Sequence, residues 1–170
     1  MKRFYLFLAI VFFIIFLDIL TKELAERFLA DKNITLIPGF FDLTLVWNRG
    51  AAFGILAQAP EFVRKLVLIF ASLIAVLVAI IYAYKKQNSL HPIQLYALAL
   101  ISGGALGNLY DRIFLGAVRD FIDWHIKNYH WPAFNIADSA ITLGIVMFVV
   151  YEIFFKKKKK GIEGETIPPQ

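Results

Sequence analysis

Carboxylates in the second half of the chain are the residues best suited to chemistry. Asp120 and Asp123 lie in the stretch AVRDFIDWH, and Asp138 lies near the start of the apolar stretch PAFNIADSAITLGIVMFVVYEIFF. The connection from Asp120 to Asp138 is short enough for the two side chains to meet. Two carboxylates within hydrogen-bonding reach cannot both ionise easily, so one keeps its proton near neutral pH. Such a pair could activate water and protonate a reacting group, which is the chemistry of hydrolysis. The spacing leaves open whether Asp120 or Asp123 is the partner of Asp138.

Other catalytic chemistries find little support in the sequence. The chain has no cysteine, which excludes disulfides, thiolate catalysis and cysteine metal sites. Its three histidines are not closely spaced, which argues against a zinc site. Ser139 follows Asp138, but no lysine or histidine base is obviously placed to activate it. We expect no metal and no cofactor, because a carboxylate pair needs only water.

Asp138 also has a purely structural interpretation. Asn135 can be the N-cap of a helix, which places Asp138 at the third helical position, where its carboxylate can bond back to the cap. The positive end of the helix dipole favours a negative charge there. The position of Asp138 on its own therefore leaves both catalysis and capping open.

Further polar residues lie where apolar stretches end. Asp18 and Lys22 are one helical turn apart and can form an ion pair. Asn108, Asp111 and Arg112 share one helix face through their spacings of three and four. Both sets have structural explanations: a helix-end ion pair in the first case, and an Asp–Arg network that anchors the helix at the membrane interface in the second.

Four apolar runs must position these residues. They cover residues 4–20, 62–84, 92–109 and 136–155, and each is close to the ~20 residues that cross a bilayer as a helix. With 59% hydrophobic residues in 170, the sequence predicts an α-helical polytopic membrane protein, with a single four-helix domain over residues 1–155. The N-terminal MKRFYLFLAIVFF imitates a secretory signal peptide. No small-x-small cleavage site follows it, so we expect a retained first span.

Positive charges predict the orientation of the spans. The net charge is +5, and basic residues flank the spans at Lys2 and Arg3, at Lys85 and Lys86, and in the run 156–160. In a four-span protein these three places share one side of the membrane, and the positive-inside rule makes that side the cytoplasm. Both termini are therefore expected in the cytoplasm, with 156–170 as a basic, disordered tail. This arrangement favours membrane lipid rather than nucleic acid as a partner.

The topology leaves two external segments, 21–61 and 110–135. In the first, Pro38-Gly39 is a turn signal and FFDLTLVW favours a strand; in the second, AVRDFIDWH favours a strand. A small extracytoplasmic β-sheet on four transmembrane helices, with a second external loop, is the simplest assembly. All three tryptophans lie in these segments, and indole rings favour the membrane–water interface.

Small residues indicate two places of close approach. The stretch RGAAFG, which follows the first predicted strand and Asn48, suits a tight backbone near a ligand or a packed helix. Gly103 and Gly107 form a small-xxx-small pair that lets another helix approach closely.

Taken together, these residues resemble the lipoprotein signal peptidase (signal peptidase II) family, aspartic proteases of the bacterial cytoplasmic membrane. Five ordered blocks carry the resemblance along nearly the whole chain: DILTK at 18–22, NRGAAFG at 48–54, GGALGNLYDR at 103–112, VRDFID at 118–123 and PAFNIADS at 132–139. In this family the aspartates of the V-x-D-F and F-N-x-A-D blocks form the catalytic dyad. By resemblance these are Asp120 and Asp138, which favours Asp120 over Asp123.

The resemblance implies removal of the signal peptide from prolipoproteins that carry a diacylglyceryl-modified cysteine, with the cut just before that cysteine. It also implies inhibition by cyclic peptides such as globomycin, and we expect a monomer. Asp18 and Lys22 are expected to hold the first span against the site. Arg119 stands where an apolar residue is common in the family; we expect it to alter local charge without removing activity. Further residues that match the family blocks and are expected to orient the dyad or the substrate are Asn48, Gly50, Asn108, Asp111, Arg112 and Asn135.

Two other classes of protein would also place acids in a membrane. Intramembrane carboxylates often mark ion paths, so a small transporter or proton channel is one alternative. A non-catalytic assembly factor, in which the acids only anchor helices, is the other. Against a transporter, the carboxylates cluster at one face of the membrane and no span carries a charge at its centre.

Overall fold

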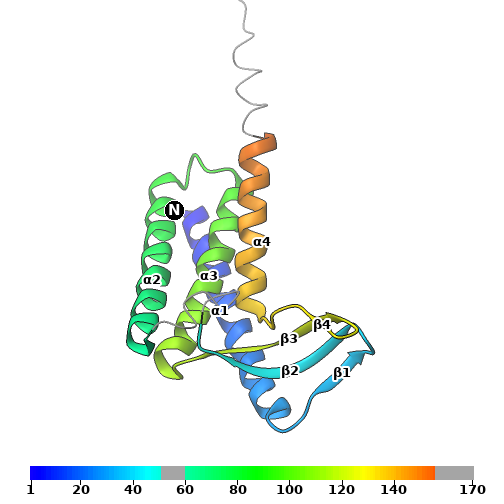
Figure 1. Cartoon of the computed structure of the whole chain (residues 1–170). Helices are drawn as coiled ribbons and strands as arrows, with labels where there is room; N and C mark the ends of the chain where they lie inside the picture. Colours follow the sequence, from blue (N-terminus) through cyan, green and yellow to red (C-terminus); the bar gives the residue numbers. More distant parts are fainter. Residues whose placement is uncertain (51–59, 156–170) are drawn as a thin grey trace, which may run out of the picture.

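Four helices long and apolar enough to cross a membrane form the body of the protein (Figure 1). The computed structural model describes residues 1–50 and 60–155. The helices are α1 (Lys2–Leu29), α2 (Glu61–Lys86), α3 (Pro92–Phe114) and α4 (Ile136–Val150), the last continued by a π-helical turn, η2 (Tyr151–Phe155). The prediction of four membrane-spanning helices is therefore confirmed.

Two of these helices extend further than their apolar runs. Helix α1 continues nine residues past the predicted end at 20, through TKELAERFL, which is rich in strong helix formers. Ala25 and Leu29 in this extension are buried against Phe121 of the sheet, so tertiary packing also favours the longer helix. Helix α3 likewise runs to Phe114 instead of ending at 109. Both helices therefore continue into the predicted external segments 21–61 and 110–135.

Glycines let α3 pack closely against its neighbours. A Cβ atom on Gly103 would lie 2.7 Å from Cβ of Ile14 in α1, and one on Gly107 would collide with the Asp18 carboxylate. The predicted close approach at Gly103 and Gly107 is thus present, and α1 is the helix that approaches. Gly104 serves the other side of α3, where a Cβ would collide with the carbonyl oxygen of Ala137 in α4.

An antiparallel four-stranded sheet forms the second layer, in the order β1-β2-β3-β4. Its strands are β1 (Ile34–Ile37), β2 (Phe41–Asn48), β3 (Val118–Ile126) and β4 (Tyr129–His130). Both predicted strands are present, and the predicted turn places Gly39 at φ +75°. In the β2–β3 pair, Val46 lies opposite Asp120 and Asn48 lies opposite Val118.

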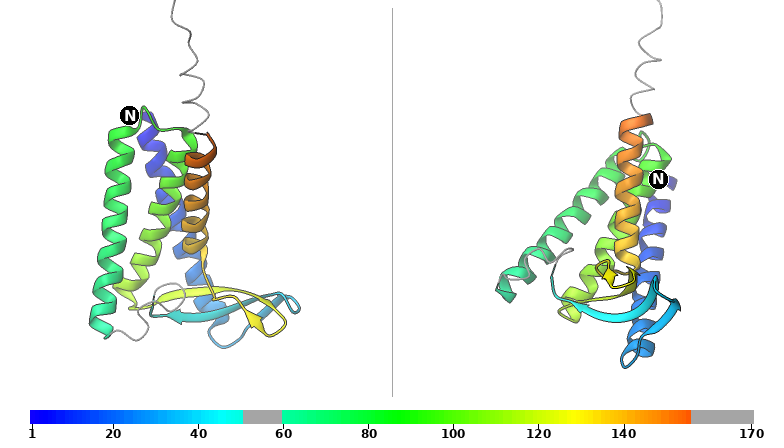
Figure 2. Two further views of the ribbon diagram at one scale, coloured as in Figure 1. Left: turned by 45° about the horizontal axis from the view of Figure 1, so that its top comes forward. Right: turned by 45° about the vertical axis from the view of Figure 1, so that its right-hand side comes forward.

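The sheet lies across one end of the helical bundle, and the N-terminus lies at the other end (Figures 1 and 2). It is held there by the extension of α1 and by the short connection from the sheet to the start of α4. The stretch Ala51–Gly54, part of the predicted tight backbone, lies outside the described residues, as does the predicted basic tail 156–170.

Candidate active site

Asp120 is the third residue of β3 and is almost completely buried, with 1% of its surface exposed. Asn48 of β2 donates its side-chain Nδ2–H to Oδ2 of Asp120 at 2.9 Å. Asn135 donates its Nδ2–H to Oδ1 at 2.7 Å. The strand register explains the first contact, since Asn48 is two residues from Val46, the direct partner of Asp120, and therefore lies diagonally on the same face.

Asp138 lies at the third position of α4 and is partly exposed. Its Oδ2 accepts from the backbone N–H of Asn135 at 3.3 Å, and the Asn135 side-chain oxygen accepts from the backbone N–H of Asp138 at 2.9 Å. This is the reciprocal cap that the sequence predicts. Asn108 of α3 donates its Nδ2–H to Oδ1 of Asp138 at 2.8 Å.

The Asn135 side chain joins the two aspartates. Its oxygen is used by the helix cap, which directs its nitrogen to Asp120, so both groups of one amide are fixed. The structure thereby brings together the strand carboxylate and the helix carboxylate that the sequence places 18 positions apart. Capping and a place in the carboxylate pair are compatible for Asp138, because the cap itself holds the pair together.

The environments of the two carboxyl groups differ. Burial, together with repulsion from the Asp138 carboxylate, raises the pKa of Asp120 to about 7, against the opposing effect of the hydrogen bonds from Asn48 and Asn135. Asp120 therefore holds a proton up to neutral pH. Asp138, in contrast, is partly exposed.

Asp123 belongs to a different part of the surface. It is three residues from Asp120 along a strand and so points to the opposite face of the sheet. Its carboxylate contacts the ring of His130 at 2.8 Å. Of the two candidates that the sequence offers, Asp120 is the one that lies beside Asp138.

Lys22 and Asp18 form a buried ion pair behind the carboxylates, with 2.6 Å between Lys22 Nζ and Asp18 Oδ2. Lys22 also donates to Oδ1 of Asn108 at 2.9 Å. Asp18 accepts from the backbone N–H of Ala137 at 2.9 Å, a contact that tethers the start of α4 to α1. The predicted pair is present, but it lies inside α1 and not at the end of the helix, because α1 continues to Leu29.

Asp111 has a different arginine partner from the one that its spacing indicates. Arg119 of β3 contacts Asp111 through two parallel bonds, Nη2 to Oδ1 at 2.8 Å and Nε to Oδ2 at 3.3 Å. Arg112 is partly buried, and among the described residues none forms a hydrogen bond or ion pair with its guanidinium. Its charge acts instead on Asp138 and Asp120 through space. The expected Asp–Arg network thus exists with Arg119, because β3 crosses the end of α3 beside Asp111.

Two residues that sequence reasoning missed, Glu23 and Glu26, extend this network outward. Arg119, completely buried, donates through Nη1 to Glu23 at 2.7 Å and Glu26 at 2.8 Å, both on the extension of α1. The i, i+3 spacing of the two glutamates, within a run of strong helix formers, could have indicated a continued helix with an acidic face.

At the other end of the site, Gly50 donates its backbone N–H to Oδ1 of Asn48 at 2.9 Å and so fixes the direction of that amide.

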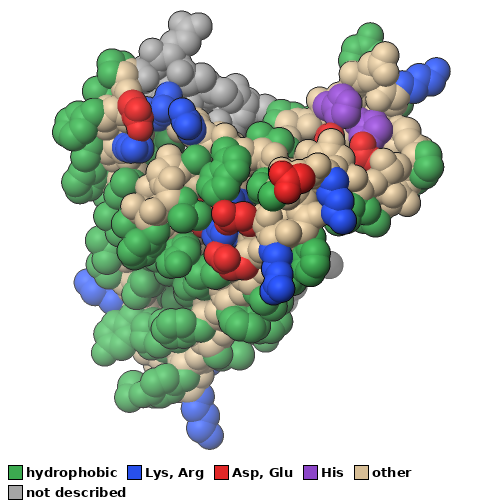
Figure 3. All heavy atoms as spheres, turned by 90° about the horizontal axis from the view of Figure 1, so that it is seen from below, with side chains coloured by type: hydrophobic (Ala, Val, Ile, Leu, Met, Phe, Trp, Pro, Cys, Tyr) green, Lys and Arg blue, Asp and Glu red, His purple; other side chains and the backbone are tan. Residues whose placement is uncertain are grey.

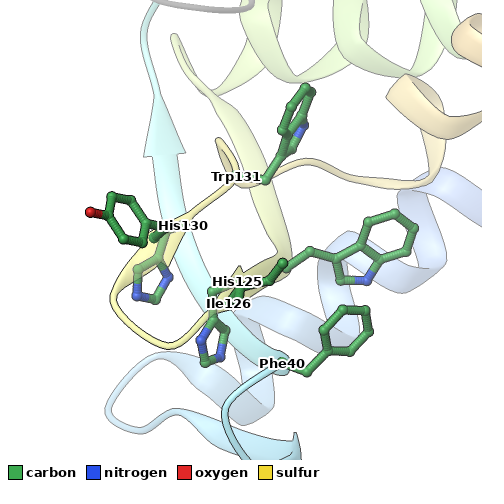
Figure 4. Close-up of a pocket in the computed structure, with 7 residues that line it drawn as sticks. Phe40, His125, Ile126, His130 and Trp131 are labelled. Carbon is green, nitrogen blue, oxygen red and sulfur yellow. The ribbon is translucent and has the colours of Figure 1, made fainter.

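A hollow of about 350 Å³ lies on the sheet, and its lining includes neither Asp120 nor Asp138. Figure 4 shows the rings of Phe40, His125, His130 and Trp131 around it. His125 and His130 stack with 4.6 Å between ring centroids. The lining is aromatic and includes none of the residues predicted to act in catalysis; in full it consists of Phe40, Trp124, His125, Ile126, Tyr129, His130 and Trp131.

Fold and site together define a polytopic membrane protein with a carboxylate pair, one member buried and one partly exposed, at the sheet-covered end of its bundle. Figure 3, which views that end, shows acidic and basic side chains gathered on this face among hydrophobic ones. Residues 10–155 match the family model of signal peptidase (SPase) II, Peptidase_A8. The chain belongs to the signal peptidase II family and is a membrane protease.

Similar proteins agree with this assignment. The lipoprotein signal peptidase of Sulfurihydrogenibium sp. (strain YO3AOP1) is 54% identical over 158 residues, which cover 93% of this chain and 97% of that protein. The lipoprotein signal peptidase of Aquifex aeolicus (strain VF5) is 41% identical over 165 residues, 97% of this chain and 96% of that protein. A solved bacterial membrane enzyme superposes with a TM-score of 0.75 at 28% identity, covering 96% of this chain and 94% of that one. The transporter, channel and assembly-factor alternatives are set aside.

Proposed function

We propose that this protein removes the signal peptide from bacterial prolipoproteins, with Asp120 and Asp138 as its catalytic pair. The observation that carries the proposal is the amide of Asn135, which holds a buried carboxyl group and a partly exposed carboxylate in one hydrogen-bonded unit. The substrate is a prolipoprotein whose cysteine bears a diacylglyceryl group, and the bond cut is the one just before that cysteine. A lipid-bearing substrate can reach the site laterally from the bilayer.

The unequal environments of the two acids support a different role for each. Asp138, ionised, takes a proton from water as the water oxygen attacks the scissile carbonyl carbon. Asp120, protonated below its pKa of about 7, gives its proton to the carbonyl oxygen as the tetrahedral intermediate forms. Asp138 then returns its proton to the departing cysteine nitrogen while the C–N bond breaks, and Asp120 recovers its own proton from the intermediate.

The supporting residues fall into three roles under this proposal. Asn48, fixed by Gly50, and Asn135 orient Asp120, while Asn108 orients Asp138. Asp18 and Lys22 hold α1 against α4 and direct Asn108, and Asp111 anchors β3. Arg112, whose guanidinium forms no hydrogen bond within the described residues, is available to bind a substrate carbonyl or a negative charge that develops near the pair.

Charge and aromatic placement support an orientation in the inner membrane. Lys2 and Arg3 lie at the bundle end opposite the sheet, which supports a cytoplasmic location of that end and of both termini, with the site on the extracytoplasmic face. The exposed rings of Trp124 and Tyr129 on the sheet would contact membrane lipid at the outer surface. Cyclic peptides such as globomycin are expected to inhibit the protein, which would act as a monomer.

A cleavage assay with purified protein in detergent tests the proposal. The substrate is a prolipoprotein carrying the diacylglyceryl cysteine, with an unmodified version as the comparison, and products are resolved by gel shift and mass. Wild type should release the signal peptide at the cysteine, while Asp120→Asn and Asp138→Asn should remain folded and inactive. Asp123→Asn is the matched control and should retain activity. Retained cleavage in a folded Asp120→Asn or Asp138→Asn variant would contradict the assignment of the pair.

A further inference from the structure

The side chain of Arg119 is a buried charge, like those of Asp18, Lys22 and Asp111 in the same polar network. It is 0% exposed, and every partner in its hydrogen bonds is a carboxylate: Asp111, Glu23 or Glu26. A buried guanidinium is tolerated only when such partners satisfy it. The arginine therefore occupies a place formed for it by α1 and α3.

The main chain of Arg119 is tied to the site as well. Its backbone N–H donates to Oδ2 of Asp111 at 3.0 Å, and its carbonyl oxygen accepts from Nδ2 of Asn135 at 3.3 Å. Asp120 is the next residue. A displacement of β3 at this point would consequently move the buried member of the carboxylate pair.

Besides its ion pair with Asp18 at 2.6 Å, Lys22 has two further acceptors that compete for its charge. Its Nζ lies 2.9 Å from Oδ1 of Asn108 but 3.6 Å from Oδ2 of Asp111. Asp111 is completely buried, and the two parallel bonds from Arg119 satisfy its charge. Without that arginine, the nearest cation for the buried Asp111 carboxylate would be Lys22.

We infer that Arg119 is a positioning residue for the catalytic pair, because its charge neutralises Asp111 and so leaves Lys22 directed at Asn108. The amide of Asn108 in turn holds Asp138 through its Nδ2–H at 2.8 Å. The inference rests on the proposed function. It also replaces the expectation that Arg119 only alters local charge.

The route is this series of contacts, from Arg119 through Asp111, Lys22 and Asn108 to Asp138. It makes a distinct prediction for Arg119→Met, which removes the charge and keeps much of the side-chain volume. Lys22 should move toward Asp111 and loosen Asn108. Misplacement of a catalytic group by about 1 Å can cost about 100-fold in rate. We expect kcat to fall about 10- to 100-fold, with KM within about threefold of wild type because no substrate contact is removed.

A second substitution tests the route itself. Asp111→Asn in the Arg119→Met background removes the buried charge that would attract Lys22. The double variant should therefore be clearly more active than Arg119→Met alone. A double variant no more active than Arg119→Met would overturn the inference, as would a folded Arg119→Met enzyme with the kcat of wild type.

Two further variants keep the test decisive. Arg27→Met is the matched control, because Arg27 is an exposed arginine on the same helix extension that contacts the ring of Phe28, and its kcat should not change. If Arg119→Met does not fold, Arg119→Gln is measured instead. It also removes the charge but keeps a polar end, so a lower kcat at unchanged KM supports the inference and a wild-type kcat overturns it. Absence of cleavage by folded wild type would contradict the proposed function itself.

Discussion

The side-chain nitrogen of Asn135 lies 2.7 Å from Oδ1 of Asp120, so the residue that caps a membrane helix also holds a carboxyl group on a strand. Helix caps are usually local devices that satisfy the first N–H groups of their own helix. Here the cap is part of a tertiary junction between α4 and β3. Both polar groups of its amide are engaged, because the nitrogen donates to Asp120 and the oxygen accepts from the backbone N–H of Asp138.

Substitution of Asn135 by Ala should therefore damage both stability and activity. Loss of the cap should cost about 1 kcal/mol of stability, and freeing Asp120 should lower kcat by about 100-fold, as misplacement by about 1 Å can do. Thermal unfolding in detergent and the cleavage assay measure the two effects. Asn33→Ala is the control, because Asn33 forms an exposed side-chain hydrogen bond with Thr44 and none with either aspartate, and it should leave kcat intact.

The rate of cleavage should fall as the pH rises through about 7. Asp120 must be protonated to act as the acid, and its pKa is raised to about 7 by burial and by Asp138. A pH–kcat profile on the diacylglyceryl substrate measures the alkaline limb. A profile that stays flat from pH 6 to about 9 would contradict the assignment of Asp120 as the acid.

The same carboxyl group should make stability depend on pH. Because the pKa is raised in the folded state, its stabilising contribution is fully present below the unfolded value of 3.8 and is lost as the pH rises through about 7. That rise corresponds to about 4 kcal/mol at most. Asp120→Asn should accordingly raise the unfolding temperature relative to wild type at pH 8 and lose this advantage at pH 5. An equal difference at both pH values would argue against the raised pKa.

Buried and exposed ion pairs of the same spacing should respond very differently to truncation. Lys22 and Asp18 are separated by 2.6 Å and are fully buried, while Lys65 and Glu61 are separated by 2.7 Å and are largely exposed. Lys22→Met leaves a buried carboxylate without its partner and should destabilise the protein by about 3–5 kcal/mol. Lys65→Met should hardly alter the unfolding midpoint. Similar losses of stability in both variants would show that burial does not determine the cost of truncating the ion pair.

Two glycines on the α3–α4 contact separate effects on packing from effects on catalysis. A Cβ on Gly104 would collide with the carbonyl of Ala137, next to Asp138, while a Cβ on Gly144 would lie 2.7 Å from the carbonyl of Ala97 within the span. Both Gly→Ala variants should lower stability, because overpacking a close contact costs about 1–3 kcal/mol. Only Gly104→Ala should also lower kcat strongly in the folded fraction. Equal losses of kcat in the two variants would contradict a specific effect of Gly104 on the position of Asp138.

Much of the architecture follows from local patterns in the sequence. Apolar runs of membrane-crossing length identify the four helices, and FFDLTLVW and AVRDFIDWH carry the aromatic and β-branched character of strands. The cap of α4 is also local, since Asn135 and Asp138 have the spacing of a reciprocal cap. The Asp18–Lys22 pair follows from i, i+4 geometry within one helix.

The remaining features depend on how separate elements cross. Spacing on α3 indicates a neighbouring arginine for Asp111, but the partner is Arg119, which only the course of β3 brings close. Helix α1 continues beyond its apolar run because residues of its extension pack against Phe121, a contact that the length of the run does not reveal. Asn108 contacts Lys22 of α1 and, at the start of α4, Asn135 and Asp138, which no local pattern contains.

The position of Asp138 on the last of the four helices has a consequence for biosynthesis. Ribosomes release the chain from its N-terminus onward, so β3 with Asp120 emerges and can pair with β2 before α4 has entered the bilayer. Until α4 inserts, the buried carboxyl group has neither its partner nor the amide of Asn135 beside it. Under the proposed roles, the carboxylate pair therefore forms only when the final helix inserts, and a chain that ends before α4 should be inactive.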